Sequence, residues 1–353
     1  MKKFFILAAA ALVAIAACSK NEADTTSFEK NRQISFAAVN GKATKAPIES
    51  TYYPTDIPFG VFAYALTEGK TWDANSADGQ LYMDDETISY NTTEDANGIY
   101  APATTYYWPL SGSLTFVGYS PKATTGDVAY VPATKVLTVT DFTVNATAAS
   151  QQDLMWATTQ KDCTDETTTD KGNYLSASDD TQSTKKGVNM VFHHALSQVK
   201  FNVKKAAGLD AYTITVNSIT FNAYGKGTLT VTNDTPVWSA QSDAMDYDTT
   251  GSDVVAPNNS EAFAEFGVAN MPVPQTLAAG TQKFTITYSL KKGGVDLGQK
   301  TVTQDLLGTA VTAWALNTIY NYNIVIDLKK IYFNPTIVEW TTGASQEINV
   351  PNA

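Results

Sequence analysis

Arginine is almost missing from this chain of 353 residues, since Arg32 is the only one. The 24 basic residues, otherwise all lysines, are outnumbered by 35 acidic residues, which gives a formal net charge of −11. Proteins that bind nucleic acid present a basic face, preferably one built from the forked guanidinium groups of arginine. The acidic balance and the lack of arginine therefore exclude nucleic acid as an expected partner.

Cysteine and histidine are also scarce, with two residues of each type. Cys163 lies in an acidic stretch, which disfavours the reactive thiolate, so it is a poor candidate nucleophile. The histidines, His193 and His194, are adjacent, and neighbouring side chains of a strand point to opposite faces. We therefore predict no disulfide framework, no metal site, no cofactor and no catalytic residue. Burial of apolar side chains must stabilise the fold.

Helical periodicity is missing after the first eighteen residues. Short segments rich in Val, Ile, Thr, Tyr and Phe recur instead, separated by Gly, Pro, Asn and Asp. The predicted strands are 34–39, 59–66, 114–119, 136–144, 199–203, 212–221, 228–231, 283–290, 320–328 and 336–340. Strands of this length and spacing predict an all-β fold made of sandwiches.

The first 17 residues predict an export signal. Two lysines precede an apolar run from Phe4 to Val13, which is shorter than the ~20 residues of a membrane-spanning helix. The run leads into Ile15-Ala16-Ala17-Cys18, which resembles a bacterial lipobox. This resemblance implies that Cys18 is acylated, with palmitate among its chains, and anchors the protein in the cell outer membrane. An ordinary secretory cleavage near Ala17 is the alternative.

The length fits two domains. Residues 18–33 are polar and predict a flexible tether to the lipid. The Thr- and Asp-rich stretch 158–187 is either a linker or a long loop, so we predict one β-sandwich domain over 34–187 and a second over 188–353. A second acidic stretch, 240–260, predicts a long loop in the second domain.

Five segments, in this order, resemble landmarks of the fimbrillin-like proteins of Bacteroidales: Pro58–Tyr64, Tyr107–Pro109, Leu114–Pro121, Asp153–Ala157 and Val191–Phe201. Together they span most of the chain after the leader. The resemblance implies a type V pilus subunit with two tandem transthyretin-like β-sandwich domains, exposed on the cell surface in a fimbrium that supports adhesion. It also implies donor-strand exchange, in which a surface protease removes the first strand and a neighbouring pilus subunit donates a replacement.

The first predicted strand can be tested against this scheme. Ile34, Phe36 and Ala38 alternate so that they would face the core, with Ser35 and Ala37 facing out, and could plug a groove. An open sheet edge offers unpaired backbone groups and empty side-chain pockets, and a donated strand satisfies both. The plug prediction requires that the strand lies in the hydrophobic interior and is not held centrally between paired neighbours.

Lys45, and after it Lys42, are the candidate cleavage sites, because they lie in a segment of small residues directly after the first strand. The proteases that process fimbrillin-like proteins are best known for cutting after arginine. Arg32 precedes the first strand, so a cut there would leave the strand in place. Removal of the strand therefore requires a protease that accepts lysine. The alternative is that both lysines belong to a solvated turn.

Residues 344–353 place Ile348 and Val350 on one face, which is typical of a donor strand. The same pattern also fits the last native strand of the second domain.

Two other functions remain open. The cluster Tyr106-Tyr107-Trp108 could stack on sugars, which would make the chain a lipid-anchored glycan-binding protein of a nutrient-uptake system. In a sandwich, large aromatic residues more often belong to the core. An enzyme such as a glycosidase would require two carboxylates that converge across a cleft, and sequence spacing cannot show that.

Overall fold

A computed structural model describes residues 33–40, 53–91, 99–164, 174–176, 179–183, 187–249, 251–328 and 331–339. The fold is nearly all-β with sandwich-like sheets, as the sequence predicts. The described helices are α2 (Trp72–Asn75) and the 3-10 turns η1 (Ser76–Asp78) and η2 (Ala148–Ser150). None of the helices in this part of the chain is long and apolar enough to cross a membrane.

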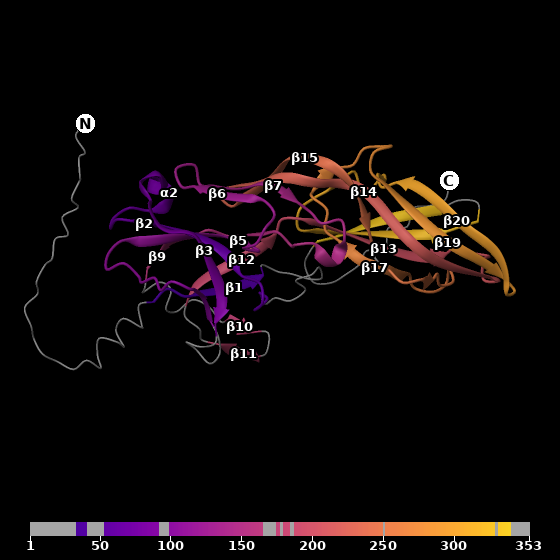
Figure 1. Cartoon of the computed structure of the whole chain (residues 1–353), viewed down its shortest axis with the longest axis horizontal. Coiled ribbons are helices and arrows are strands. Elements are labelled where there is room, and N and C mark those ends of the chain that lie inside the picture. Colours follow the sequence, from indigo (N-terminus) through magenta and orange to yellow (C-terminus); the bar gives the residue numbers. More distant parts are fainter. Residues whose placement is uncertain are drawn as a thin grey trace, which may run out of the picture.

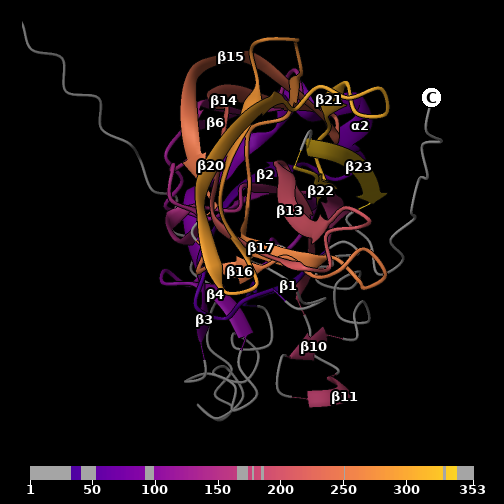
Figure 2. The same ribbon diagram turned by 90° about the vertical axis from the view of Figure 1, so that its right-hand side faces the viewer.

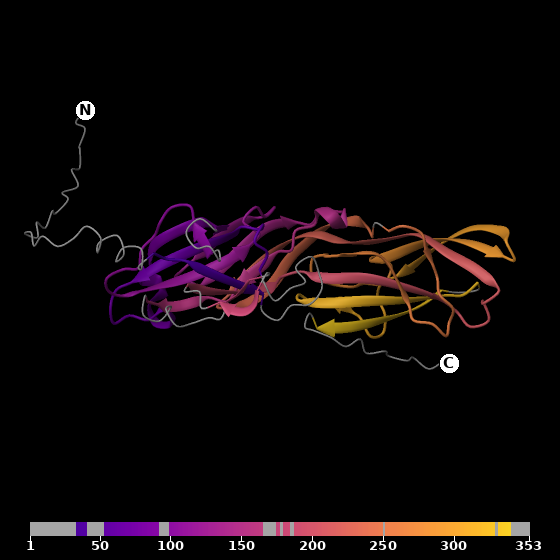
Figure 3. The same cartoon turned by 90° about the horizontal axis from the view of Figure 1, so that it is seen from below.

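The molecule is elongated, with the first half of the chain at one end and the second half at the other (Figure 1). The view from below gives the same arrangement (Figure 3). Seen toward the end formed by the second half, β14 and β20 lie on one side and β13, β22 and β23 on the other (Figure 2). This end is therefore a sandwich of two layers.

The first sheet has the strand order β2-β3-β4-β1-β12-β8-β5-β9, and β2 also pairs with β5. These pairings run in a closed circuit around a hydrophobic core. Its strands are β1 (Phe36–Asn40), β2 (Phe59–Leu66), β3 (Gln80–Asn91), β4 (Ile99–Pro102), β5 (Ser113–Ser120), β8 (Met155–Ala157), β9 (Gln160–Cys163) and β12 (Val188–His194). Phe59, Val61 and Ala63 point into this core, while the alternate residues of β2 join a second core shared with the rest of the molecule.

The second sheet joins both halves of the chain. Its order is β20-β19-β14-β7-β6, with β15 and β16 also paired to β14. The strands are β6 (Asp127–Val131), β7 (Val136–Thr143), β14 (Tyr212–Thr232), β15 (Thr235–Asp248), β16 (Val254–Val255), β19 (Lys283–Lys292) and β20 (Val295–Asp305). Because β6 and β7 precede the predicted boundary and β14 follows it, this sheet crosses that boundary.

A four-stranded sheet, in the order β17-β13-β22-β23, forms the other layer of the second half. Its strands are β13 (Ser197–Lys205), β17 (Ala264–Asn270), β22 (Thr318–Ile326) and β23 (Ile331–Glu339). Two small pairings complete the described structure: β10 (Tyr174–Ser176) with β11 (Asp179–Ser183), and β18 (Gln275–Thr276) with β21 (Ala313–Trp314).

The polar stretch 158–187 leaves the first sheet and returns to it. Its beginning pairs with β5 through β9, and β12, which starts directly after it, pairs with β1 and β8. The stretch is therefore a long excursion from one sheet, which favours the loop alternative over a linker. The boundary drawn between residues 187 and 188 falls inside this sheet, because the alternating apolar residues of β12 pack into its core.

Two other expectations are wrong. The stretch 240–260 does not begin as a loop, because β15 continues to Asp248 along β14, and Tyr247 stacks on Phe221 with ring centroids 4.8 Å apart. The segments 212–221 and 228–231 form the single strand β14, since buried and half-buried residues keep alternating between them. Acidic and glycine-containing sequence conceals both strands.

Candidate functional site

The first strand, β1, lies inside the first sheet with neighbours on both sides. On one side it pairs in parallel with β12 over five residues, from Phe36 opposite Val188 to Asn40 opposite Phe192. On the other side its antiparallel ladder with β4 contains one pair, Phe36 opposite Tyr100. The strand therefore lies in the hydrophobic interior, as expected, but the expectation that it is not held centrally between paired neighbours is wrong. Alternation of apolar residues reveals that a strand is buried, but not how many neighbours it has.

The pairing continues just before β1. The amide of Ile34 donates a hydrogen bond to the carbonyl of Tyr106 at 2.9 Å, and Gln33 forms an isolated bridge with Tyr107. The chain before β1 is therefore fixed beside residues 106–107 rather than beside β4. Together the two contacts extend the weaker flank of the strand.

The side chains of Ile34, Phe36 and Ala38 are buried in the core of the first sheet. Phe36, only 2% exposed, lies edge-on to two rings, with centroid distances of 6.1 Å to Phe59 and 5.5 Å to Phe116. Ala37, expected to face solvent, is buried as well. The outward face of β1 is therefore covered at Ala37.

Tyr53 fixes the chain that follows the segment after β1. Its hydroxyl lies 2.6 Å from the hydroxyl of Ser120, and its ring centroid lies 4.9 Å from that of Phe192. The hydroxyl of Tyr100 donates to the carbonyl of Tyr53 at 2.8 Å. Burial raises the pKa of Tyr53, so the phenol keeps its proton. We name β4, β12 and the side chains of Tyr53, Phe59 and Phe116 the first-strand site.

Gly187 allows β1 to approach β12 closely. A Cβ atom added to Gly187 would lie 2.9 Å from the carbonyl oxygen of Ser35, and the amide of Val188 donates to that oxygen at 2.8 Å. Neither Tyr53 nor Gly187 was among the residues that the sequence singled out. A glycine between a polar stretch and an apolar strand is a weak signal, because loops contain many glycines.

The other residues predicted to act in assembly lie outside the described part of the chain. They are Cys18 for lipidation, Lys42 and Lys45 for processing, and Ile348 and Val350 for the donor strand. Cys163 is described and half-buried, with its sulfur 3.7 Å from the carbonyl oxygen of Lys161.

The three members of the aromatic cluster differ in burial. Trp108 is 6% exposed and packs against Phe116 in the core of the first sheet. Tyr106 donates a hydrogen bond to Glu86 at 2.6 Å, and this bond raises the pKa of Tyr106 to about 12. Tyr107, which is 41% exposed, is the member of the cluster that offers its ring to solvent. Of the three rings that could stack on a sugar, Trp108 is therefore buried and Tyr107 is the exposed one.

The two histidines make separate hydrogen bonds from opposite faces of β12. The Nδ1 atom of His194, which is buried, lies 2.8 Å from a carboxylate oxygen of Asp153. The Nε2 atom of His193 lies 2.8 Å from the hydroxyl of Thr158, and its ring stacks on Trp156. In the described ranges no three His, Cys, Asp or Glu side chains gather as a metal site would require.

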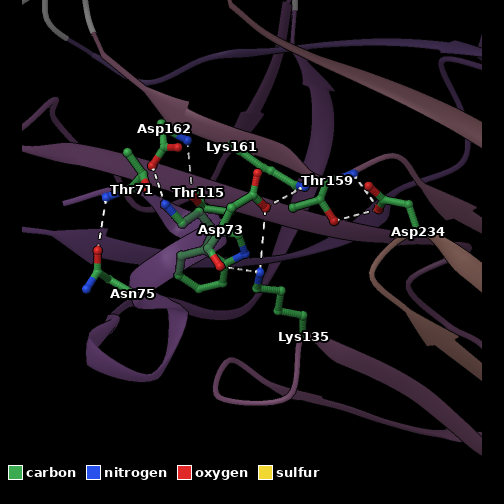
Figure 4. Close-up of polar contacts among 10 residues, drawn as sticks. Thr71, Asp73, Asn75, Thr115, Lys135, Thr159, Lys161, Asp162 and Asp234 are labelled. Atoms are coloured by element: carbon green, nitrogen blue, oxygen red, sulfur yellow. Dashed lines mark hydrogen bonds and ion pairs between the residues drawn. The ribbon is translucent and has the colours of Figure 1, made fainter.

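A polar network connects the turn between β14 and β15 to the first half of the chain (Figure 4). Asp234, in that turn, accepts hydrogen bonds from the amide of Thr159 at 2.9 Å and from its hydroxyl at 2.7 Å. The ammonium of Lys161 lies 2.8 Å from the carboxylate of Asp73, and that of Lys135 lies 3.5 Å from it. We name these five residues the polar network.

The network sits at the junction between α2, β9 and two hairpin turns. The lysine contacts, that of Lys161 first, lower the pKa of Asp73 below its usual 3.8. Next to them, a carboxylate oxygen of Asp162 accepts from the amide of Trp72 at 2.8 Å (Figure 4). The arrangement holds ordinary structural contacts between surface groups.

Similarity to known proteins extends over most of the chain. A family model described as fimbrillin-like matches residues 56–340. The structure is similar to a fimbrial protein from Bacteroides vulgatus, with a TM-score of 0.59 and 18% identity over 88% of this chain and 100% of that one. At this identity the likeness shows the fold alone.

A weaker similarity is to the fimbrial anchor protein Mfa2 from Porphyromonas gingivalis, with a TM-score of 0.31 and 12% identity over 87% of this chain and 98% of that one. No curated protein matches the sequence.

Proposed function

Because the chain belongs to the fimbrillin-like family, we propose that it is a surface subunit of a fimbrium that supports adhesion and assembles by donor-strand exchange. In this proposal Cys18 carries the lipid that holds the exported chain at the outer membrane. A surface protease then cuts after Lys45 or Lys42, β1 leaves, and a strand from another subunit replaces it. The two halves of the molecule correspond to the transthyretin-like domains of such a subunit.

The observation that supports this proposal is the way β1 is held. Its contacts are backbone pairing and apolar packing, with Phe36 between Phe59 and Phe116. Another extended strand with suitable side chains can make both kinds of contact. Contacts of directional side-chain groups could not be transferred in this way.

The paired neighbours on both sides of β1 overturn the mechanism expected from the sequence, in which a strand at an open edge is simply released, so displacement replaces release in this proposal. Loss of β1 would expose backbone groups of β12 and β4 together with empty pockets for three side chains, and each unpaired buried polar group costs about 1–3 kcal/mol. A strand with two paired flanks does not leave on its own. Cleavage must first free one end of β1, and the incoming strand must then displace it and satisfy both flanks.

Tyr53 would keep the new N-terminal end of the processed subunit packed in the core. It follows Lys45 in the sequence, so it stays with the protein after cleavage at either lysine. Its contacts with Ser120, Tyr100 and Phe192 do not involve β1. The new N-terminal segment therefore remains attached to the same core.

Limited proteolysis tests the proposal directly. The purified chain is treated with a protease that cuts after lysine, and the products are identified by N-terminal sequencing. We expect a stable core that begins after Lys42 or Lys45 and captures a labelled peptide of residues 33–40. The intact chain should not capture the peptide, and a variant carrying Lys42→Gln and Lys45→Gln should resist opening. A core that has lost β1 but binds no such peptide would contradict the proposal.

A further inference from the structure

The sizes of side chains on β1 and β12 are complementary. In the parallel register Phe36 stands opposite Val188, and Ala38 stands opposite Met190. Paired residues of neighbouring strands project from the same face and pack against each other. The large residue of β1 thus meets a smaller partner, and the small residue meets a longer one.

The space beside Ala38 cannot widen easily. Met190 is fully buried, and its terminal methyl group packs against Gly118. A Cβ atom added to Gly118 would lie only 2.5 Å from that methyl group. Interiors are packed as closely as organic crystals, and added methylene groups force shifts of neighbouring atoms. The place of Ala38 therefore accepts only a small side chain.

The space around Phe36 cannot shrink easily either. Phe59, one of its walls, is held by Tyr53 at a centroid distance of 5.4 Å, and Phe116 is held by Trp108 at 5.8 Å. Rings fixed from behind relax little when the ring between them is removed, so an aliphatic replacement leaves a void.

Residues 341–353 do not fit these two places. They include no aromatic residue, and their apolar alternation consists of Ile348 and Val350. With Ile348 at the place of Phe36, either Val350 or Gln346 falls at the place of Ala38, depending on strand direction. With Val350 at the place of Phe36, that position receives Asn352 or Ile348. Each alternative leaves a void at one place and crowds the other.

We infer that the first-strand site selects a donor strand with an aromatic residue two positions from a small one. The strand therefore comes from a subunit other than a second copy using its residues 341–353. This inference rests on the proposed function and adds the chemical nature of the partner.

Peptide competition on the processed chain tests the inference. The labelled 33–40 peptide is displaced by a peptide of residues 341–353, and by the same peptide carrying Ile348→Phe and Val350→Ala. We expect the substituted peptide to bind about tenfold more tightly than the unmodified one, the factor associated with filling one apolar pocket. A matched control peptide carries Ile348→Phe and Val350→Leu, which supplies the ring without a small residue two positions from it, and should gain nothing because the place of Ala38 is then crowded.

Three outcomes separate the inference from the proposed function. If the substituted peptide gains affinity and the control does not, the inference stands. If the unmodified 341–353 peptide binds as tightly as the first-strand peptide, the inference is overturned while donor-strand exchange remains. If even the 33–40 peptide fails to bind the processed core, the proposed function fails and the inference fails with it.

Discussion

Two regions of this protein hold segments that are distant in sequence, and they do so by different means. The first-strand site binds β1 through backbone pairing and buried rings. The polar network binds the turn between β14 and β15 through the two hydrogen bonds from Thr159 to Asp234, while its ion pairs join Asp73 of α2 to Lys161 and Lys135.

The difference bears on which segment can be exchanged. Apolar burial is non-directional and depends on shape and area, so a strand of matching shape from another chain can supply it. Hydrogen bonds depend on particular donors and acceptors at fixed distances. The region suited to exchange between subunits is therefore the apolar one, and the polar region fixes the two halves of a single chain.

The substitution Phe36→Ala should have the largest effect. It removes a buried ring between Phe59 and Phe116, and truncations of this kind cost about 3–5 kcal/mol. Equilibrium unfolding in urea measures the loss. Ile337→Ala in β23 is the control, because Ile337 is 48% exposed and its truncation should cost less than about 1 kcal/mol. Equal losses for the two variants would show that the buried ring of Phe36 contributes no more to stability than the exposed side chain of Ile337.

Gly187→Val should have the second largest effect. The added side chain must displace the backbone at Ser35 and Phe36, where β1 begins, and overpacking of this kind costs about 1–3 kcal/mol of stability. After proteolysis, mass spectrometry should show that the labelled 33–40 peptide displaces the first strand faster in this variant than in the wild type. Gly187→Ala provides a graded control with a smaller effect. If both variants keep the wild-type release rate, the close approach at Gly187 does not hold β1.

The sequence predicts the burial of β1 well, because alternation of Ile34, Phe36 and Ala38 is a local property. It does not predict the neighbours of β1, because β12, with which β1 pairs, is the last strand of the first sheet in the sequence. Ala37 is buried for the same reason: its environment is set by elements distant in sequence.

The polar network escapes sequence analysis for another reason. Thr159 and Asp234 are 75 residues apart, and both are of types common on exposed loops. The strand β15 is missed because Asp, Ser and Gln residues conceal its strand character, which becomes evident only when it pairs with β14 and Tyr247 stacks on Phe221. Local patterns reveal which residues are buried, whereas the pairing that buries them depends on the whole fold.

Asp234→Gly tests the polar region with a smaller effect. Asp234 has a φ of 61°, a conformation that glycine adopts without strain, so the substitution removes the carboxylate, with its hydrogen bonds and its charge, and introduces no backbone strain. We expect a loss of about 1 kcal/mol in the free energy of unfolding. Hydrogen exchange at the β14–β15 turn should accelerate, while exchange in β1 should not. Asp234→Asn keeps an acceptor oxygen and is the control, and equal acceleration in β1 would contradict the separation of the two regions.

The smallest expected effect concerns the pH dependence of stability. It involves both regions, because His193 lies on β12 and the charge of Asp234 acts on its pKa. Burial, and then His194, lowers the pKa of His193 below its usual 6.5, while Asp234 acts in the opposite direction. The unfolded chain therefore takes up the proton first, so stability present at neutral pH is lost as the pH falls through 6.5. His193→Gln should reduce the loss measured by urea unfolding between about pH 7.5 and 5.5. Asp234→Gly should deepen it, because the charge that favours protonation of the folded state is gone. An unchanged pH dependence in Asp234→Gly would show that the first-strand site and the polar network are electrostatically independent.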